Sequence, residues 1–126
     1  MIKKLILVVE DDTVSASLLS DKLVSAGFEA EVAIDGEKGL EATKKKPDLI
    51  LLDIMLPKMD GLTLMKAIRE GGEWGAQVPI IITSNLSPDD EAIDKVATYS
   101  PVFYLMKAEH SLDDIVEKTK EVLKLK

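Results

Sequence analysis

The sequence predicts an α/β protein built as a (βα)₅ doubly wound parallel sheet with strand order 2-1-3-4-5. Two observations carry this prediction. Short, continuously apolar runs alternate with longer amphipathic segments along the whole chain, and such alternation is typical of a parallel sheet covered by helices through right-handed crossovers. The runs are also apolar at nearly every position, as expected for strands that are buried on both faces. Open five-stranded sheets of this kind commonly have the stated strand order.

The predicted strands follow from these runs in chain order. Residues 5–9, 49–52, 79–82 and 102–106 are continuously apolar and therefore indicate inner strands. Residues 29–34 alternate between polar and apolar side chains, a pattern typical of a strand at the border of a sheet.

Helices are predicted in the segments between the strands. Ser87 and Ser111 each precede an acidic first turn, and a serine in that place favours the start of a helix. Gly27 favours the end of the first helix. The apolar residues of the first predicted helix are Val14, Leu18, Leu19 and Leu23. In chain order, the predicted helices span residues 13–26, 36–46 and 61–70, a segment opened by Ser87, and the final segment from 111 onward. Residues 70–77, which contain three glycines and the lone Trp74, are predicted to form a loop.

Composition excludes several kinds of function. The chain of 126 residues has no cysteine and a single histidine, His110, so disulfide scaffolds, thiolate zinc sites and multi-histidine metal sites are excluded. The 16 basic residues include only one arginine and are outnumbered by 23 acidic residues, which argues against direct nucleic-acid binding. No apolar run approaches the ~20 residues of a membrane span. We therefore expect one cytoplasmic domain over residues 1–126, without an output domain and without membrane contact.

Polar residues follow the predicted inner strands at the point where each strand ends. Glu10, Asp11 and Asp12 follow the first strand, and Asp53 follows the third. Thr83 and Ser84 follow the fourth strand and Lys107 follows the fifth. Because ligands of open α/β sheets bind outside the carboxyl ends of the strands, and the first and third strands are neighbours, we expect Glu10, Asp11 and Asp53 to converge. Asp12 could equally cap the helix that it precedes.

This set of residue types indicates a site for phosphoryl groups. Carboxylates from two loops, without histidine or cysteine, suit Mg²⁺, and a cation is needed to offset the repulsion among them. The metal ion and Lys107 would neutralise phosphoryl oxygens, Thr83 would donate a hydrogen bond, and Asp53 would be the attacking carboxylate.

Four segments resemble the receiver domain of two-component response regulators, of the CheY-like single-domain kind, which has a flavodoxin-like fold. They are Val8–Asp12, Leu51–Gly61, Ile82–Ser84 and Tyr104–Lys107. The resemblance covers essentially the full chain, and the stretch from Asp53 to Gly61 is its most specific part.

The resemblance implies a role for each matching position. Asp53 would accept a phosphoryl group from a histidine kinase or a phosphotransfer protein. The Mg²⁺ ligands would be Glu10, Asp11, Asp53 and the backbone carbonyl of Met55. Thr83, Ser84 and Lys107 would bind the phosphoryl group, while Thr83 and Tyr104 would act as the switch. The face formed by the helix opened by Ser87, the strand at 102–106 and the final helix from 111 onward (helix 4, strand 5 and helix 5 in the predicted order) would then regulate a partner protein. The chain would not be an enzyme, although it would assist its own Mg²⁺-dependent phosphorylation and dephosphorylation.

One departure from the family pattern affects Lys107. Family members usually place a proline joined by a cis bond after this lysine, whereas Ala108 follows here. A cis bond costs ~2.5–4 kcal/mol when the second residue is not proline. We therefore predict a trans Lys107–Ala108 bond or a rearranged loop.

Three other readings compete with this one. A phosphatase of the haloacid-dehalogenase type needs an acid two positions after its nucleophilic aspartate, where this chain has Met55. A flavin-binding flavodoxin-like protein needs a phosphate-binding loop after the first strand, where acidic residues 10–12 would repel phosphate. A receiver that serves only as a scaffold remains the third alternative, although Asp53, Thr83 and Lys107 are all present.

Overall fold

The structure is a computed structural model that describes residues 3–54, 56, 59–84 and 103–123. It contains one sheet of five parallel strands in the order β2-β1-β3-β4-β5, which confirms the predicted fold class and strand order. The strands are β1 (Leu5–Val9), β2 (Glu29–Ala33), β3 (Leu49–Leu52), β4 (Ile80–Ser84) and β5 (Phe103–Met106).

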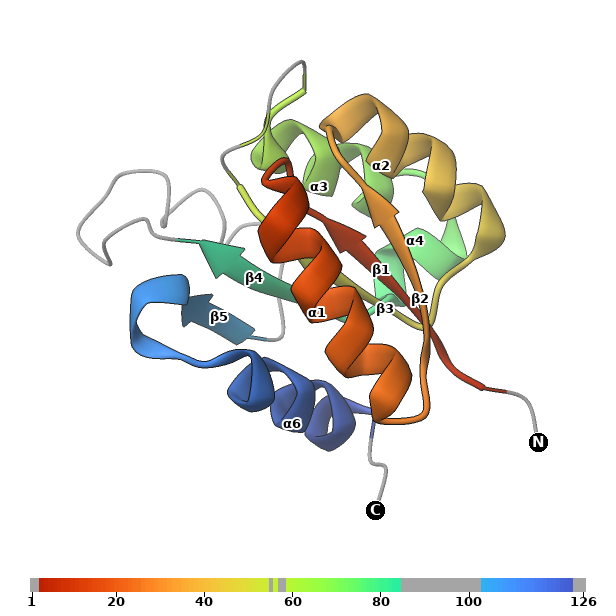
Figure 1. The fold of residues 1–126 in the computed structure, drawn as a ribbon. Helices are drawn as coiled ribbons and strands as arrows, with labels where there is room; N and C mark the ends of the chain where they lie inside the picture. The colour runs from red at the N-terminus through yellow and green to blue at the C-terminus, as the bar shows by residue number, and fades with distance from the viewer. Residues whose placement is uncertain (1–2, 55, 57–58, 85–102, 124–126) are drawn as a thin grey trace.

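Helices cover both faces of the sheet (Figure 1). Helices α1 (Thr13–Ser25) and α6 (Leu112–Val122) pack on one face, while α2 (Gly36–Ala42), α3 (Gly61–Arg69) and α4 (Glu73–Gln77) pack on the other. Successive residues of the inner strands point to opposite faces, so Ile6 joins one hydrophobic cluster and Leu7 the other. All four residues of β3 are buried, as expected for a strand covered on both sides.

Strand β2 lies at one border of the sheet, as its alternating sequence predicts. It pairs with β1 in parallel register, with Leu5 opposite Glu29. Glu31, on the same strand, forms an ion pair of 2.8 Å with Lys45. Acidic side chains therefore stand at alternate positions along the bordering strand.

The predicted end of the first helix at Gly27 and the predicted start of the last helix at Ser111 are both present, and Asp12 caps the first helix. The carboxylate of Asp12 accepts the backbone N–H of Val14 at 3.1 Å and thus caps α1, and Gly27 follows the helix with a φ of 101°. The hydroxyl of Ser111 accepts the backbone N–H of Asp114, whose carboxylate accepts the Ser111 N–H in return. The helix predicted after Ser87 lies outside the described residues.

Two apolar positions of α1 are not in the core. Val14 is 66% exposed and Leu18 is 51% exposed, while Leu19 and Leu23 are buried. At 100° per residue, positions 14 and 18 lie on the side of the helix opposite to positions 19 and 23. Val14 and Leu18 therefore stay outside the core and form an exposed apolar pair.

Helix α2 is shorter than predicted, because residues 36–46 do not form one continuous helix. It ends at Ala42, and a 3₁₀ turn, η1, follows over Thr43–Lys45. Lys46 then adopts a left-handed conformation with φ 51° and ψ 61°. Pro47 explains this ending, since proline disfavours the right-handed helical conformation of the residue before it.

The segment predicted as a loop at 70–77 contains the short helix α4. Three side-chain hydrogen bonds hold this helix in place. Arg69 Nη1 donates to the carbonyl oxygens of Gly75 at 2.9 Å and Val78 at 2.6 Å, and Trp74 Nε1 donates to that of Pro47 at 3.2 Å. Glycine content favours a loop in local terms, so these tertiary contacts account for the helix. Within the part of the chain that the structure describes, no helix is long and apolar enough to cross a membrane.

Candidate functional site

The backbone places Glu10 and Asp53 beside each other. Val9 lies opposite Leu52 in the β1–β3 ladder, and each acidic residue directly follows one of these two. Both residues also continue the ladder, because the Glu10 N–H donates to Ala33 O and the Asp53 N–H donates to Val9 O, each at 3.0 Å. The two side chains are therefore held by the sheet rather than by free loops.

Three carboxylates meet at this edge of the sheet. Glu10, Asp11 and Asp53 each offer a carboxylate oxygen, and the three oxygens lie within 4.8 Å of one another. Glu10 and Asp53 are buried, whereas Asp11 is exposed. The Asp53 side chain is 9% exposed, so part of the carboxylate is still in contact with solvent. Asp12 does not belong to this group; it caps α1, as the alternative reading allowed.

Lys107 reaches the same carboxylates from the end of β5. Its Nζ donates to Glu10 Oε2 at 2.5 Å and to Asp53 Oδ2 at 2.8 Å. Residues Lys107–Glu109 form a 3₁₀ turn, and the described residues contain no cis peptide bond. The predicted trans Lys107–Ala108 bond is thus present, and the lysine still points into the acidic site.

The charges of this site alter its pKa values. The pKa of Glu10 is raised to about 7, mainly by burial; the neighbouring Asp53 contributes to this rise, and Lys107 opposes it. Burial alone would lower the pKa of Lys107, but its hydrogen bonds to Asp53 and Glu10 raise it above its ordinary value. Lys107 is therefore charged at neutral pH, and Glu10 changes its charge near neutrality.

Thr83 and Ser84 form the end of β4 rather than a loop after it. Both are buried, and the Ser84 hydroxyl has no hydrogen-bond partner among the described residues. Thr83 lines a cavity of about 180 Å³ together with Glu10, Lys107 and His110. The structure thus groups Thr83 with Glu10 and Lys107. His110 was not among the expected site residues; the only sequence signal for it is its position three residues after Lys107.

A close backbone contact fixes the start of α3 beneath Asp53. The Gly61 N–H donates to Ile54 O at 2.8 Å. A Cβ at position 61 would lie 2.4 Å from Ile54 Cα, so only glycine fits there.

Three residues that the sequence predicted at the site are not fully described by the structure. Met55 and Pro57 lie outside the described residues, as does the side chain of Tyr104, whose backbone belongs to β5.

The chemistry of the carboxylate group suits a hard divalent cation. All its donors are carboxylate oxygens that come from two adjacent strand ends, and Mg²⁺ binds such oxygens in preference to nitrogen or sulfur. The ammonium of Lys107 already lies among these oxygens, which shows that the site accommodates positive charge. The cluster therefore fits Mg²⁺.

Comparison with known proteins agrees with this geometry. Residues 6–120 match the family model described as the response regulator receiver domain. The alkaline phosphatase synthesis transcriptional regulatory protein PhoP of Bacillus subtilis is 42% identical over 94 residues, which are 74% of this chain and 37% of that protein. The DNA-binding dual master transcriptional regulator RpaA of Synechocystis is 38% identical over 89 residues, 70% of this chain and 36% of that protein. The chain thus spans little more than a third of these relatives.

Solved structures resemble the whole chain. The receiver domain of the Francisella response regulator 1452 is 28% identical with a TM-score of 0.84, covering 97% of this chain and 98% of that one. A CheY-like response regulator receiver domain protein of Methanospirillum hungatei is 27% identical with a TM-score of 0.84, covering 98% and 95% of the two chains.

Proposed function

This chain belongs to the response regulator receiver domain family, and we propose that it is a phosphorylation-dependent signalling switch whose phosphoacceptor is Asp53. Proteins of this family act in two-component systems. The observation that carries the assignment to Asp53 is the position of its carboxylate: Oδ2 lies 2.8 Å from the Lys107 ammonium, and a carboxylate oxygen lies within 4.8 Å of one from Glu10 and one from Asp11.

The proposed reaction transfers one phosphoryl group from a phosphohistidine of a histidine kinase or phosphotransfer protein. A carboxylate oxygen of Asp53 attacks phosphorus, the bond between phosphorus and the imidazole nitrogen breaks, and the electron pair of that bond stays on the imidazole. The product on this chain is an acyl phosphate. Lys107 would then exchange its contact with the carboxylate for a contact with phosphoryl oxygens, which stabilises the charge that the transfer brings in.

Mg²⁺ would be held by Glu10, Asp11 and Asp53, with Met55 as a further proposed ligand through its carbonyl. When bound, the ion supplies positive charge that offsets the repulsion between the carboxylates and the incoming phosphoryl oxygens. Glu10 and Lys107 would separate to the extent that the ion replaces the lysine as the partner of Glu10.

The raised pKa of Glu10 predicts that Mg²⁺ binding depends on pH. Below about 7 Glu10 carries a proton, so a cation must displace that proton. The apparent affinity should therefore fall as pH decreases from 8 to 6, by up to about tenfold per unit. Calorimetric Mg²⁺ titrations at pH 6, 7 and 8 would measure it. In the Glu10→Gln variant this pH dependence should be absent; equal affinity of the wild type at all three pH values would contradict the prediction.

Thr83 and Ser84 are proposed to bind the phosphoryl group after transfer. The buried Ser84 hydroxyl without a partner among the described residues supports this proposal, since a buried hydroxyl without a hydrogen bond costs about 1–3 kcal/mol.

The proposed switch is an equilibrium between two conformations of the domain. Reversing such an equilibrium from 1:99 to 99:1 takes ~5.5 kcal/mol. New hydrogen bonds from Thr83 and Lys107 to the charged phosphoryl group, at about 1.5–3 kcal/mol each, come close to that value. Tyr104 is proposed to follow Thr83, and the face formed by the helix predicted after Ser87, β5 and α6 is proposed to regulate the partner.

The exposed apolar pair of α1 is a suitable contact for the kinase. Val14 and Leu18 lie on the first two turns of the helix that directly follows Asp11 and Asp12. A protein that delivers a phosphoryl group to Asp53 must approach this edge of the sheet. Apolar side chains at the centre of an interface contribute strongly to affinity, so we propose that the kinase packs against Val14 and Leu18.

Replacing the exposed pair should impair transfer from a kinase but not from a small phosphodonor. The Val14→Ser, Leu18→Ser double variant is expected to lower kcat/KM for transfer by about tenfold, which corresponds to a loss of about 1.4 kcal/mol of binding energy. The assay would use a histidine kinase that phosphorylates the wild type. Val24→Ser is the matched control, since Val24 is 53% exposed at the other end of the same helix. Equal kinetics for the double variant and the control would contradict the proposed contact.

Phosphoryl uptake tests the proposed function as a whole. The protein is incubated with a small acyl phosphate or phosphoramidate and Mg²⁺, and its intact mass is measured over time. One phosphoryl group per chain is expected, with uptake lost in the presence of a chelator. Absence of uptake at any Mg²⁺ concentration would favour the scaffold reading, and repeated turnover of a phosphomonoester would favour the phosphatase reading.

A further inference from the structure

A groove lies at the end of the sheet opposite to the acidic cluster. It has a volume of about 670 Å³ and runs between the end of α2 with its 3₁₀ turn and the segment that joins α3 to α4. Because residues 43–46 lead from α2 to the start of β3, this groove borders the amino ends of the strands. A volume of this size is typical of sites for small molecules, which occupy about 300–1,000 Å³.

The walls of the groove are apolar and aromatic. Leu40, Ala67, Ile68 and Trp74 line it, together with the glycines of the turn before α4. The hydrogen bonds of Arg69 to Gly75 and Val78, and that of the Trp74 indole to Pro47 O, hold the aromatic wall in place. A Cβ on Gly75 would lie 1.9 Å from Ile68 O, so α4 packs directly on α3. The groove is therefore preformed, which reduces the entropy lost when a ligand binds.

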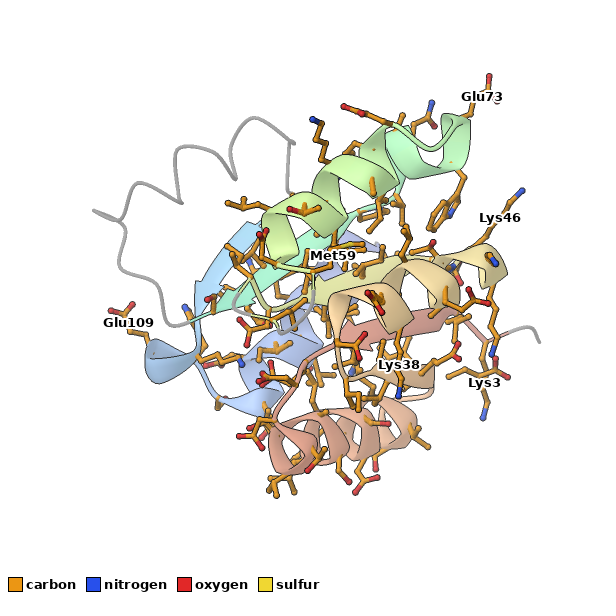
Figure 2. All side chains as sticks on the ribbon, turned by 90° about the horizontal axis from the view of Figure 1, so that it is seen from above. Lys3, Lys38, Lys46, Met59, Glu73 and Glu109 are labelled. Carbon is orange, nitrogen blue, oxygen red and sulfur yellow. The ribbon has the colours of Figure 1, made fainter. Side chains whose placement is uncertain are left out.

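The rim of the groove carries basic side chains. Lys44 and Lys46 both line it, as does Glu73, and Figure 2 shows Lys46 and Glu73 at the same end of the molecule. Lys44 forms an ion pair of 3.1 Å with Glu41. Within the described residues, the structure shows no carboxylate paired with the Lys46 ammonium. The rim therefore offers one solvent-exposed ammonium without a carboxylate partner among the described residues, which can pair with an anionic group of a ligand.

The backbone of Lys46 provides a second, independent observation. Its φ of 51° makes it the sole non-glycine residue with positive φ among those that the structure describes. This conformation is unfavourable for a residue with a Cβ, and glycine or asparagine usually follows a helix in this way. Together with the following Pro47, this conformation fixes the backbone of Lys46 at the rim of the groove, so its side chain starts from a defined place there.

We propose that this groove binds a small molecule with a flat apolar body and one anionic group. The apolar body would stack on Trp74 between Leu40 and Ile68, and the anionic group would pair with Lys46. Such a ligand would be a second input to this domain, separate from the phosphoryl group, and the proposal does not depend on the assignment of Asp53.

The lone tryptophan makes the proposal testable by NMR spectroscopy. The spectrum of the ¹⁵N-labelled chain should contain one indole N–H signal, because Trp74 is the only tryptophan. Titration with 2-naphthoate as the probe should shift this signal saturably, and neutral 2-naphthamide should bind about tenfold more weakly or worse. Lys46→Gln should weaken 2-naphthoate binding by about tenfold, as expected for the loss of a charge-assisted hydrogen bond.

Two variants separate binding from folding and from general charge effects. Lys38→Gln also removes one lysine charge, but Lys38 lies on α2, does not line the groove and is apart from Lys46 (Figure 2). This variant should bind 2-naphthoate like the wild type. Lys46→Gly relieves the left-handed strain, so it should unfold at or above the wild-type temperature while binding weakly. The proposal is overturned if 2-naphthoate causes no saturable shift, if 2-naphthamide binds equally well, or if Lys38→Gln weakens binding as much as Lys46→Gln.

Discussion

The Asp53→Asn variant is expected to take up no phosphoryl group. The amide keeps the size of the carboxylate but lacks its nucleophilic charged oxygen, so the rate of acyl phosphate formation should fall by more than about a thousandfold. The fold should persist, because the Asp53 backbone N–H still donates to Val9 O within the sheet. Intact mass after incubation with a small phosphodonor and Mg²⁺ measures the result.

Asp12→Asn is the matched control for this experiment. Asp12 is an acid from the same edge of the sheet, but it is exposed and caps α1. Asparagine caps helices about as well as aspartate, so this variant should be phosphorylated at nearly the wild-type rate. Uptake by Asp53→Asn at the wild-type rate would place the acceptor elsewhere in the chain.

The Lys107→Met variant is expected to be markedly less stable at pH 8. Lys107 contacts both Glu10 and Asp53, and its side chain is only 26% exposed. Its removal leaves buried carboxylates uncompensated, for which we expect a loss of about 2 kcal/mol in the free energy of unfolding. Methionine keeps an unbranched apolar stem, so the packing changes little. Urea denaturation at pH 8 without metal measures the effect.

This loss should depend on pH and on metal. Glu10 has a pKa of about 7, so it is charged at pH 8 and protonated at pH 5.5. The carboxylate repulsion that Lys107 offsets is therefore smaller at pH 5.5, and the difference from the wild type should shrink there. Mg²⁺ should also stabilise the variant more than the wild type. Lys120→Met, which removes the ion-pair partner of the exposed Glu117, should change stability by less than about 0.5 kcal/mol. A Lys107→Met variant as stable as the wild type at pH 8 would contradict this account.

The buried strands and the acidic edge could be predicted because each depends on a short range of sequence. Continuous apolar runs indicate inner strands, and the strand order then brings Glu10 and Asp53 onto neighbouring strand ends. The caps at Asp12 and Ser111 likewise depend on bonds between residues two or three apart. These features need no knowledge of distant contacts.

The features that sequence reasoning missed depend on tertiary contacts. Helix α4 persists in a glycine-rich segment because Arg69 and Trp74 bond to backbone carbonyls outside the helix. Lys107 was expected as a cation among the carboxylates, but the particular oxygens that it contacts depend on how the chain turns after β5. Which apolar residues of α1 are buried also depends on the side of the helix that faces the sheet: Leu19 and Leu23 are buried, whereas Val14 and Leu18 on the opposite side are exposed.

The acidic border of the sheet has a consequence for self-association. An unpaired strand can add a strand from another molecule and so begin an aggregate. If two copies met in antiparallel fashion with Glu31 of each chain opposite the other, like charges would face each other across the new ladder, which disfavours the pairing. The ion pair of Glu31 with Lys45 also places a long side chain beside this strand. We therefore expect the protein to resist fibril formation through β2, even at the concentrations that NMR spectroscopy requires.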